Sequence, residues 1–273
     1  MILTRAAELS SSSLTALWNA AYEGYFVPLR FDEAMVARHV RRSQIDLSRS
    51  LVGSIEGEPF GLSLAGFRDA KAWIGGFGVA PAFRRRGLAT RLLQAHLGRI
   101  DDEGLAETWL EVIEANPARE VYRRCGFDET RELLLFEGTP PVGEAGGEGE
   151  TLTLDELGKA HAELNTARPS WRRDWPTVAD CIAEGAVPLG IRREGRICAY
   201  ALVLEHGGRL TFLDAAARDS TVGALLLTAI GRRWPAAPAR LVDEPTDTAL
   251  AEALRSAGLA VGLRQVEMRR SPP

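Results

Sequence analysis

A strand–turn–strand pattern occurs twice in this chain, once in each half. The first copy, which begins at Leu51, reads LVGSIEGEPFGLSLAGF, and the second, which begins at Leu189, reads LGIRREGRICAYALVLE. Each copy has two apolar segments joined by a short charged turn that contains glycine. Internal similarity at so long a spacing indicates two whole domains of one fold rather than an array of short repeats.

The alignment continues beyond this hairpin in both halves. The matched segments are Phe77-Gly78-Val79 with Leu213-Asp214-Ala215, Gly87 with Gly223 and, after a small shift, Gly126-Phe127 with Gly258-Leu259. A duplicated domain is therefore expected.

A run of Gly, Pro and Glu separates the halves, since residues 137–150 read EGTPPVGEAGGEGE and contain little to bury. We expect a first domain over residues 1–137, a linker over 138–150 and a second domain over 151–273. In the first half, apolar segments of strand character alternate with amphipathic helical stretches, an α/β pattern. The strand-like segments are residues 50–55, 60–67, 72–79, 108–113 and 131–137.

The 273 residues carry a formal net charge of −4. This acidic balance argues against nucleic-acid and anionic-membrane partners, which need a basic surface. Cys125, Cys181 and Cys198 lack the paired spacing of a disulfide framework or a zinc site, so we expect no metal. No apolar run has the length of a membrane span or the form of a secretion signal. A cytoplasmic protein with small-molecule partners is expected.

The segment after Gly87 has the periodicity of an amphipathic helix. Its apolar face consists of Ala89, Leu92, Leu93, His96 and Ile100. A face of this kind packs on a sheet. We expect His96 to be a hydrogen-bonded core histidine rather than a catalytic one.

The turn that leads into this helix contains Arg84, Arg85 and Arg86. Cations at a helix start oppose the helix dipole, and a bound anion would remove the conflict, although a solvated arginine cluster is the other interpretation. The unpaired N–H groups of a helix start suit a diphosphate, and Gly87 lets a ligand approach the backbone. There is no GxxxxGK(S/T), and Pro81 stands where a dinucleotide-binding fingerprint has its third glycine, so neither a kinase nor a dehydrogenase is expected.

These residues resemble the GCN5-related N-acetyltransferases, the GNAT family. The acetyl-CoA signature of that family, Arg/Gln-x-x-Gly-x-Gly/Ala, is matched by residues 84–89 at every fixed position, and its Val-x-Pro step appears as Val79-Ala80-Pro81. The strand, Asn and Tyr-x-x-x-Gly-Phe that follow in the family appear as Leu110-Glu111-Val112, Asn116 and residues 122–127. Asn116 and Ala118 stand one residue closer together than in the commonest form of the motif.

The resemblance implies an α/β (α+β) fold with two tandem acyl-CoA N-acyltransferase-like domains. Each would be a mixed, mostly antiparallel twisted sheet flanked by helices. Acetyl-CoA would be the acyl donor, with its pantetheine arm paired to a splayed strand and its pyrophosphate on the turn that follows. The implied cofactor-binding residues are Phe77, Gly78, Val79, Arg84, Arg85, Arg86, Gly87, Leu88, Ala89, Thr90 and Asn116.

In this family the amine attacks the thioester directly, which implies that no enzyme nucleophile is needed. Tyr122 would then be the general acid for the departing thiolate, although a tyrosine that closes the core is the other interpretation. Cys125 is better explained as a packing residue. Since the strand before the turn has no carboxylate, the candidate general bases are Glu114 and then Glu111, each equally explicable as an exposed acid at a strand end.

Four aromatic residues of the first expected helix, Trp18, Tyr22, Tyr25 and Phe26, are spaced at i, i+4, i+7 and i+8. This spacing is typical of a core face. In the resembling family the region borders the acceptor site, which implies a substrate-binding role and an acceptor with an apolar or aromatic part.

The second half loses the features of the site under the alignment. Its replacements are Ser220 for Arg84, Val222 for Arg86, Leu225 for Ala89 and Leu254 for Tyr122. Asp214, opposite Gly78, and Asp219 would repel a diphosphate. We therefore expect a degenerate GNAT-like domain that supports the first, a layout similar to that of tandem members of the family.

The sequence thus predicts an N-acetyltransferase that moves an acetyl group from acetyl-CoA to a primary amine. A CoA-binding sensor or ligand-binding module without turnover is the alternative, and the intact Tyr122 favours the enzyme. The acceptor would be a small-molecule or peptide amine. The protein would act as a monomer that resembles a dimer, or as a homodimer.

Overall fold

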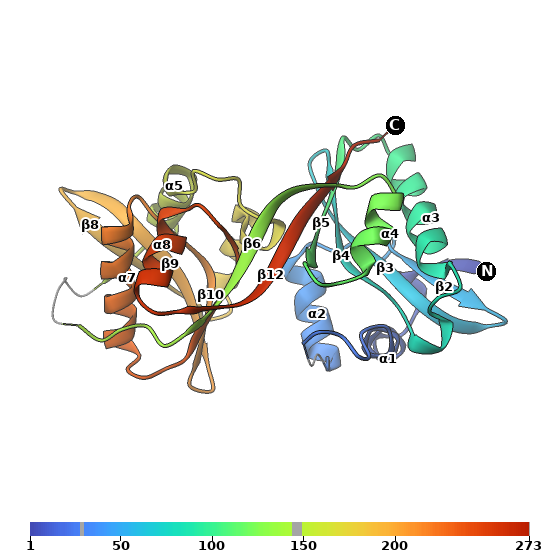
Figure 1. The fold of residues 1–273 in the computed structure, drawn as a ribbon, viewed down its shortest axis with the longest axis horizontal. Helices are drawn as coiled ribbons and strands as arrows, with labels where there is room; N and C mark the ends of the chain where they lie inside the picture. Colours follow the sequence, from blue (N-terminus) through green and yellow to red (C-terminus); the bar gives the residue numbers. More distant parts are fainter. Residues whose placement is uncertain (28–29, 144–148, 273) are drawn as a thin grey trace. The chain divides into compact units, whose positions relative to one another are not determined.

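The computed structural model describes residues 1–27, 30–143 and 149–272. They form two compact units, which are Met1–Thr130 with Val266–Pro273 (unit 1) and Arg131–Gln265 (unit 2) (Figure 1). This division differs from the expected one at residue 137, because strand β6 (Asp128–Gly138) begins in unit 1 and ends in unit 2. Residues 144–148 of the expected linker lie outside the described residues.

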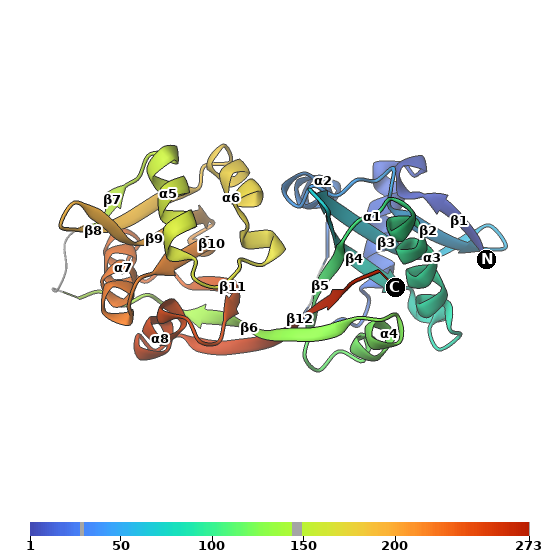
Figure 2. The same ribbon diagram turned by 90° about the horizontal axis from the view of Figure 1, so that it is seen from above.

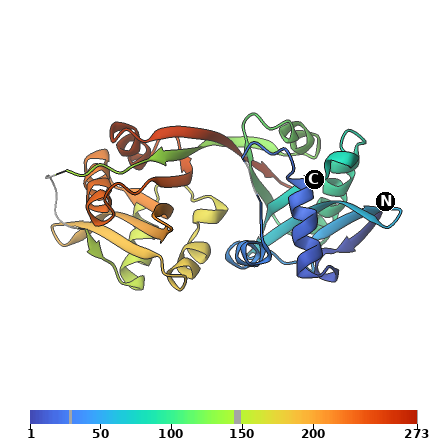
Figure 3. The same ribbon diagram turned by 90° about the horizontal axis from the view of Figure 1, so that it is seen from below.

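Unit 1 contains a mixed sheet in the order β1-β2-β3-β4-β5-β12. Its last strand, β12 (Ala260–Arg270), reaches it from the C-terminal end of the chain (Figure 3). The other elements, in chain order, are β1 (Ile2–Arg5), α1 (Ser11–Ala21), α2 (Glu33–Arg42), β2 (Leu51–Ile55), β3 (Glu58–Arg68), β4 (Lys71–Val79), a 3-10 turn at Pro81–Phe83, α3 (Leu88–Asp102), β5 (Glu107–Ile113) and α4 (Ala118–Arg124). The expected strands of the first half are confirmed.

Unit 2 repeats this plan with the strand order β6-β11-β10-β9-β8-β7. Its elements are β7 (Glu150–Thr151), α5 (Leu154–Leu164), the 3-10 turn η3 (Trp171–Arg173), α6 (Trp175–Ile182), β8 (Val187–Arg193), β9 (Arg196–His206), β10 (Arg209–Ala217), α7 (Ser220–Arg233), β11 (Ala239–Pro245) and α8 (Ala249–Ser256). Neighbouring strands pair antiparallel from β1 to β4, between β6 and β11, and from β10 to β7, whereas β4–β5 and β10–β11 pair in parallel. Two tandem domains with mixed, mostly antiparallel sheets are therefore confirmed.

Helices cover both faces of the sheet in unit 1 (Figure 2). On one face, apolar side chains of α3 and α4 pack against β4 and β5, and on the other, α1 and α2 pack against β2 and β3. Val266 and Met268 of β12 are 7% and 0% exposed in the first of these cores. The end of the chain therefore completes the core of the first unit.

His96 is a core histidine, as expected. It is fully buried on α3, where the Ser63 hydroxyl donates to its Nδ1 at 2.7 Å and its Nε2–H donates to the Arg49 carbonyl at 3.0 Å. Burial lowers the pKa of the imidazole to about 4, because the charged form would lose its hydration. The ring is neutral at physiological pH and serves packing.

Candidate functional site

Strands β4 and β5 of unit 1 pair over only part of their length. The parallel pairing joins Lys71–Trp73 to Glu107–Trp109, and within the described residues it extends no further, although β4 continues to Val79 and β5 to Ile113. The facing edges of the two strands beyond Trp73 and Trp109 are thus left without a ladder. A strand edge of this kind can hydrogen-bond an extended, amide-bearing ligand.

A bulge shapes β4 at the point where this divergence begins. Leu64 of β3 pairs with Gly76 and Ala65 pairs with Ile74, which leaves Gly75 as an extra residue. The Gly75 carbonyl accepts a hydrogen bond from Nε2–H of His39 at 3.0 Å. Bulges re-aim the backbone that follows them, and His39 holds this one from α2.

Two glycines let α1 lie directly on β4. A Cβ at Gly76 would stand 3.0 Å from the Trp18 ring, and one at Gly78 would stand 3.0 Å from the Cβ of Ala21. A side chain at either position would press on α1, which would have to move by a few tenths of an ångström. The backbone of Phe77, Gly78 and Val79, expected to meet the pantetheine arm, lies on this closely packed segment.

Arg84 fastens the end of α1 to the end of β4. Its Nε–H donates to the Val79 carbonyl at 2.8 Å, and its Nη2 donates to the carbonyls of Ala21 and Glu23 at 3.1 and 2.8 Å. The guanidinium thus stabilises the conformation of this loop through hydrogen bonds to three backbone carbonyls. Arg85 and Arg86 are exposed on the same turn.

Gly87 is the N-cap residue of α3 and has no side chain with which to cap it. Its φ is 72°, in the left-handed region, and Arg85 has a φ of 61°. The first intrahelical bond of the cap runs from Arg91 N–H to the Gly87 carbonyl, so the N–H groups of Leu88, Ala89 and Thr90 precede the helix ladder. Apart from its chain neighbours and the adjacent helix backbone, no atom of the described residues lies within 4 Å of a Cβ built at Gly87. This helix start is open and offers donors to an anion.

Tyr122 lies on α4 beside the splayed strand. Its ring centroid is 5.7 Å from that of Phe77 and 6.0 Å from that of Phe127. Burial raises the pKa of its phenol well above 10, and the nearby phenols of Tyr22 and Tyr25 raise it further. Tyr122 is therefore protonated at neutral pH and available as a proton donor. Cys125 is buried in the same core, in keeping with a packing role.

The other residues of the second motif lie around the end of β5. The Asn116 Oδ1 accepts the Ala118 N–H at 2.9 Å, so this side chain starts α4. Glu114 is exposed, and its backbone carbonyl accepts a hydrogen bond from Nη1 of Arg119 at 2.7 Å. Glu111, on β5 itself, is half-buried and accepts the indole N–H of Trp73 at 2.7 Å. Of the two carboxylates, Glu111 is the one whose side-chain hydrogen bond joins β5 to β4.

The expected helical spacing of the four aromatic residues is wrong. Helix α1 ends at Ala21, and the turn after it contains Gly24 with a φ of 73°, so Tyr25 and Phe26 follow the helix instead of lying on it. Their rings nevertheless form a chain, with centroid distances of 6.1 Å from Trp18 to Tyr22, 5.0 Å from Tyr22 to Tyr25 and 5.7 Å from Tyr25 to Phe26.

This aromatic chain passes from the core to the surface, because Trp18 is 2% exposed and Phe26 is 48% exposed. Three further members of the aromatic cluster were not predicted from the sequence. Phe31 and His39 lie 5.4 and 5.3 Å from Trp18, and Trp73 lies 6.1 Å from His39. No local pattern in the sequence marks Trp73, because its place as the last residue of β4 that pairs with β5 exists only in the folded chain.

Unit 2 has the same scaffold but a different helix start. Strands β4 and β10 have nine residues each, and both bulge at the fifth, Gly75 and Leu213. Asp214 therefore corresponds to Gly76, and the alignment of Asp214 with Gly78 is wrong by two residues. Gly223 lies inside α7 against Ala253, so its alignment with Gly87 is also wrong.

The position of Gly87 is taken in unit 2 by Asp219, the N-cap residue of α7. Its carboxylate accepts the Val222 N–H at 2.9 Å. An internal anion therefore occupies the place that is open in unit 1. Leu254 does correspond to Tyr122, because each accepts a backbone hydrogen bond from the residue five positions later, Leu259 and Phe127.

A splayed strand pair, a bulge and an uncapped helix start define an acyl-CoA N-acyltransferase fold. Residues 12–127 match the model of the Acetyltransferase (GNAT) family. This match covers most of unit 1, which is therefore similar to the family, and acyl transfer from acyl-CoA to an amine is the general activity of the family. No curated protein has a sequence that matches this chain significantly.

Solved structures of the same fold span the whole chain. A GCN5-related N-acetyltransferase from Sphaerobacter thermophilus has a TM-score of 0.73 at 19% identity, covering 99% of this chain and 95% of its own. A putative acetyltransferase from Pyrococcus horikoshii has a TM-score of 0.72 at 17% identity, with coverages of 100% and 89%. A tandem GNAT protein from the clavulanic acid biosynthesis pathway has a TM-score of 0.69 at 15% identity, with coverages of 100% and 98%.

Two further observations concern the described part of the chain. None of its helices is long and apolar enough to cross a membrane. Within residues 1–27, 30–143 and 149–272, no group of three or more His, Cys, Asp and Glu side chains could hold a metal ion.

Proposed function

We propose that unit 1 transfers an acetyl group from acetyl-CoA to a primary amine by direct attack, with Tyr122 as the general acid. The observation that carries the proposal is the divergence of β4 and β5 between the open helix start at Gly87 and the buried phenol of Tyr122. A ligand with a diphosphate at one end and a thioester at the other suits these two ends.

We assign each part of acetyl-CoA to one part of this site. The pyrophosphate would bind the N–H groups of residues 87–90, supported by the exposed charges of Arg85 and Arg86. The pantetheine amides would pair with the free edge of Phe77, Gly78 and Val79. Arg84 would act on the cofactor through the loop that it holds together, since its side chain is bonded to three carbonyls.

The chemical step needs two proton movements. The amine nitrogen attacks the thioester carbon, the C–S bond breaks, and the phenol of Tyr122 gives its proton to the sulfur. An acceptor that enters as an ammonium ion must lose a proton before it attacks, and the attacking nitrogen loses one more as the amide forms. We propose that Glu111 accepts the proton, directly or through water. Glu111 is half-buried and oriented by Trp73, whereas Glu114 is exposed at the strand end.

The acceptor would enter beside the aromatic chain that ends at Phe26. Tyr22 and Tyr25 lie close enough to Tyr122 to influence the pKa of its phenol, so they would border the sulfur of a thioester bound beside that phenol. An amine with an apolar or aromatic part suits such a wall. Unit 2, with Asp219 in place of the anion and Leu254 in place of the acid, would support unit 1 without acetyl transfer of its own.

Calorimetric titration with acetyl-CoA, followed by thiol release across a panel of amines, tests this function. We expect one acetyl-CoA per chain and thiol release with at least one amine. Binding without release from any acceptor would instead support a CoA-binding module. Absence of binding, or equal binding by an Arg84→Ala/Gly87→Glu double variant, would contradict the cofactor site itself.

A further inference from the structure

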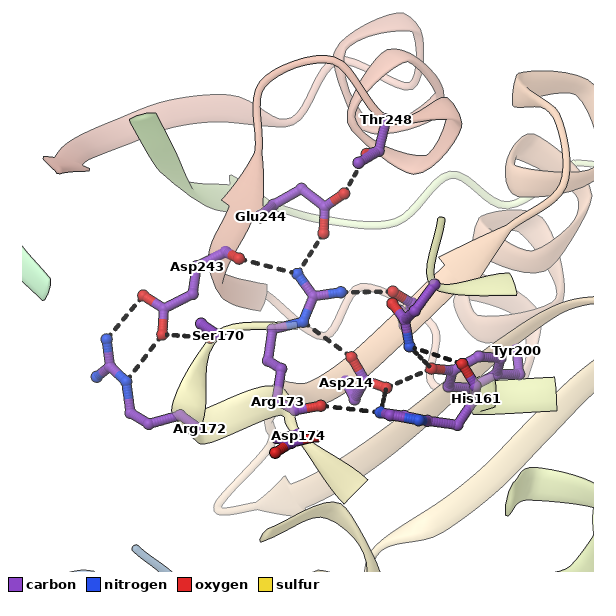
Figure 4. A network of polar contacts seen from close by, with 12 residues as sticks. His161, Ser170, Arg172, Arg173, Asp174, Tyr200, Asp214, Asp243, Glu244 and Thr248 are labelled. Carbon is purple, nitrogen blue, oxygen red and sulfur yellow. Dashed lines mark hydrogen bonds and ion pairs between the residues drawn. The ribbon is translucent and has the colours of Figure 1, made fainter. Parts of the chain in front are cut away.

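The interior of unit 2 contains a closed set of charges around Arg173, shown in Figure 4. The side chain of Arg173 is 5% exposed and lies between β10 and β11. Its Nε–H donates to Asp214 at 2.8 Å, its Nη1 donates to the Asp243 carbonyl at 3.1 Å and to the Glu244 carboxylate, and its Nη2 donates to the Ala215 carbonyl at 2.5 Å. The guanidinium thus joins the two strands at their divergence.

The three interior carboxylates all have a cationic partner. Asp214 and Glu244 pair with Arg173, and both oxygens of Asp243 accept from Arg172, at 2.7 and 2.8 Å. Burial raises the pKa of Glu244, and the adjacent guanidinium of Arg173 opposes this shift. Each interior carboxylate is thus already engaged by a side chain of unit 2.

A cavity of about 220 Å³ adjoins this network and lies entirely within unit 2. Its walls are the loop at residues 164–170, the end of β10, residues 243–245 of β11 and the start of α8. Such a volume holds roughly seven water molecules at ~30 Å³ each, which is the size of a small metabolite and far below that of CoA.

One buried hydrogen-bond donor in the wall of the cavity is available to a ligand. Arg173 is a lining residue, and four of its five N–H groups have an acceptor. The fifth, on Nη2, has none among the described residues. A buried donor without an acceptor costs about 1–3 kcal/mol, so an acceptor atom of a ligand would be stabilised there.

Charges of both signs remain at the exposed rim. Arg168, Arg218 and Asp247 line the cavity, and neither Arg218 nor Asp247 forms an ion pair in the part of the chain that the structure describes. Since the interior charges are mutually engaged, the rim groups decide which ligand charge is favourable. A cavity with both cations and an anion at its rim suits a molecule that carries both signs.

We propose that this cavity binds a small zwitterion of the α-amino acid type. Its carboxylate would accept from Arg173 and Arg218, and its ammonium group would pair with Asp247. CoA is not the ligand of this site. Asp219 caps the helix start, and the Ala215 carbonyl on the strand edge already accepts a hydrogen bond from Arg173. The site is independent of acetyl transfer by unit 1.

The test uses the full chain. Thermal unfolding is measured with each of the twenty L-α-amino acids at millimolar concentration, and the best ligand is titrated by calorimetry beside its decarboxylated amine and its deaminated acid. We expect saturable binding of at least one amino acid and binding at least about tenfold weaker, or ~1.4 kcal/mol, for both analogues. Failure of all twenty, or equal binding of either analogue, overturns the proposal.

Variants of the lining residues then test whether the amino acid binds in this cavity. Arg218→Gln and Asp247→Asn, both at exposed positions, should each weaken binding about tenfold, whereas the matched exposed controls Arg193→Gln and Asp155→Asn should not. Tyr25→Ala, in unit 1, should leave the affinity unchanged. Loss of binding in Tyr25→Ala with retention in Arg218→Gln would assign the amino acid to unit 1 and contradict the cavity in unit 2.

Discussion

Gly87 and Asp219 occupy the same position in the two units, the N-cap of the helix that follows the bulged strand. Gly87 leaves the first turn of α3 open, and Asp219 closes the first turn of α7 with its own carboxylate. The residue at the cap therefore decides whether the first N–H groups of the helix are open, as in unit 1, or already bonded to a carboxylate, as in unit 2.

Substitutions at Gly87 test the open helix start. Gly87→Ala forces a side chain into a left-handed conformation, which should lower the free energy of unfolding by about 1 kcal/mol. Gly87→Glu adds a carboxylate where the pyrophosphate would bind, and acetyl-CoA affinity should fall at least tenfold in calorimetry. Gly98→Ala, inside the same helix with open space around it, is the control and should stabilise by about 1 kcal/mol. Unchanged affinity in Gly87→Glu would exclude a phosphate at this turn.

Asp219→Ala tests the closed helix start. Loss of the cap should lower the free energy of unfolding by about 1 kcal/mol in chemical denaturation. Asp219→Asn retains an oxygen that can accept the Val222 N–H and should stay within a few tenths of a kcal/mol of the parent. Both variants should still bind one acetyl-CoA per chain. A larger loss in the Asn variant than in the Ala variant would show that the carboxylate serves another purpose.

Local patterns were sufficient for most strands and for His96, because alternation and helical periodicity report which side chains face a core. Local patterns failed where contacts between residues far apart in sequence determine the structure. Residues 266–270 complete the sheet of unit 1, yet nothing in their own pattern says which half of the chain they join. The apparent helical face of Tyr25 and Phe26 persisted past the true helix end, since aromatic spacing alone does not register the turn at Gly24.

The candidate site, like the fold, was predictable where local patterns determine it and not where distant residues meet. The turn at residues 84–90 was predictable because its donors are consecutive backbone groups at a helix start. Glu111 and Trp73, which meet across the diverging strands, are far apart in sequence and carried no local signal that joins them. The bulges at Gly75 and Leu213 shift the register of the two halves, which explains why an alignment without gaps misplaced Asp214.

Tyr122→Phe tests the general acid. Without a proton donor the thiolate leaves unassisted, so kcat should fall about a hundredfold while the KM for acetyl-CoA changes little. The pKa of the phenol is raised well above 10, so the parent enzyme should show no loss of kcat below pH 10 from ionisation of this residue. Tyr22→Phe, which removes a neighbouring hydroxyl, is the matched control. An equal fall in kcat and in acetyl-CoA affinity would indicate a packing role for Tyr122 instead.

His96 makes stability depend on pH. Its folded-state pKa of about 4 lies below the ordinary value of 6.5, so the unfolded chain binds more protons between these pH values. The stability is fully present above pH 6.5 and should fall by roughly 3 kcal/mol as the pH drops to 4. Urea unfolding across this range should show a shallower decline for His96→Gln, which lacks the titration, whatever its stability at pH 7. Parallel declines would show that acidic groups cause the whole effect.

Arg173→Met tests the charge network of unit 2. Removal of the guanidinium leaves Asp214 and Glu244 buried without a cation, which should lower the free energy of unfolding at pH 7 by about 3–5 kcal/mol. Burial already raises the pKa of Glu244, and without Arg173 the folded state gains more from protonation than the unfolded chain. The deficit should therefore grow as the pH rises from 5 to 7 and shrink when Asp214→Asn and Glu244→Gln are added. Arg172→Met, whose side chain is 35% exposed, should lose less. A deficit independent of pH, which the neutral replacements do not relieve, would mean that Arg173 contributes packing and not charge compensation.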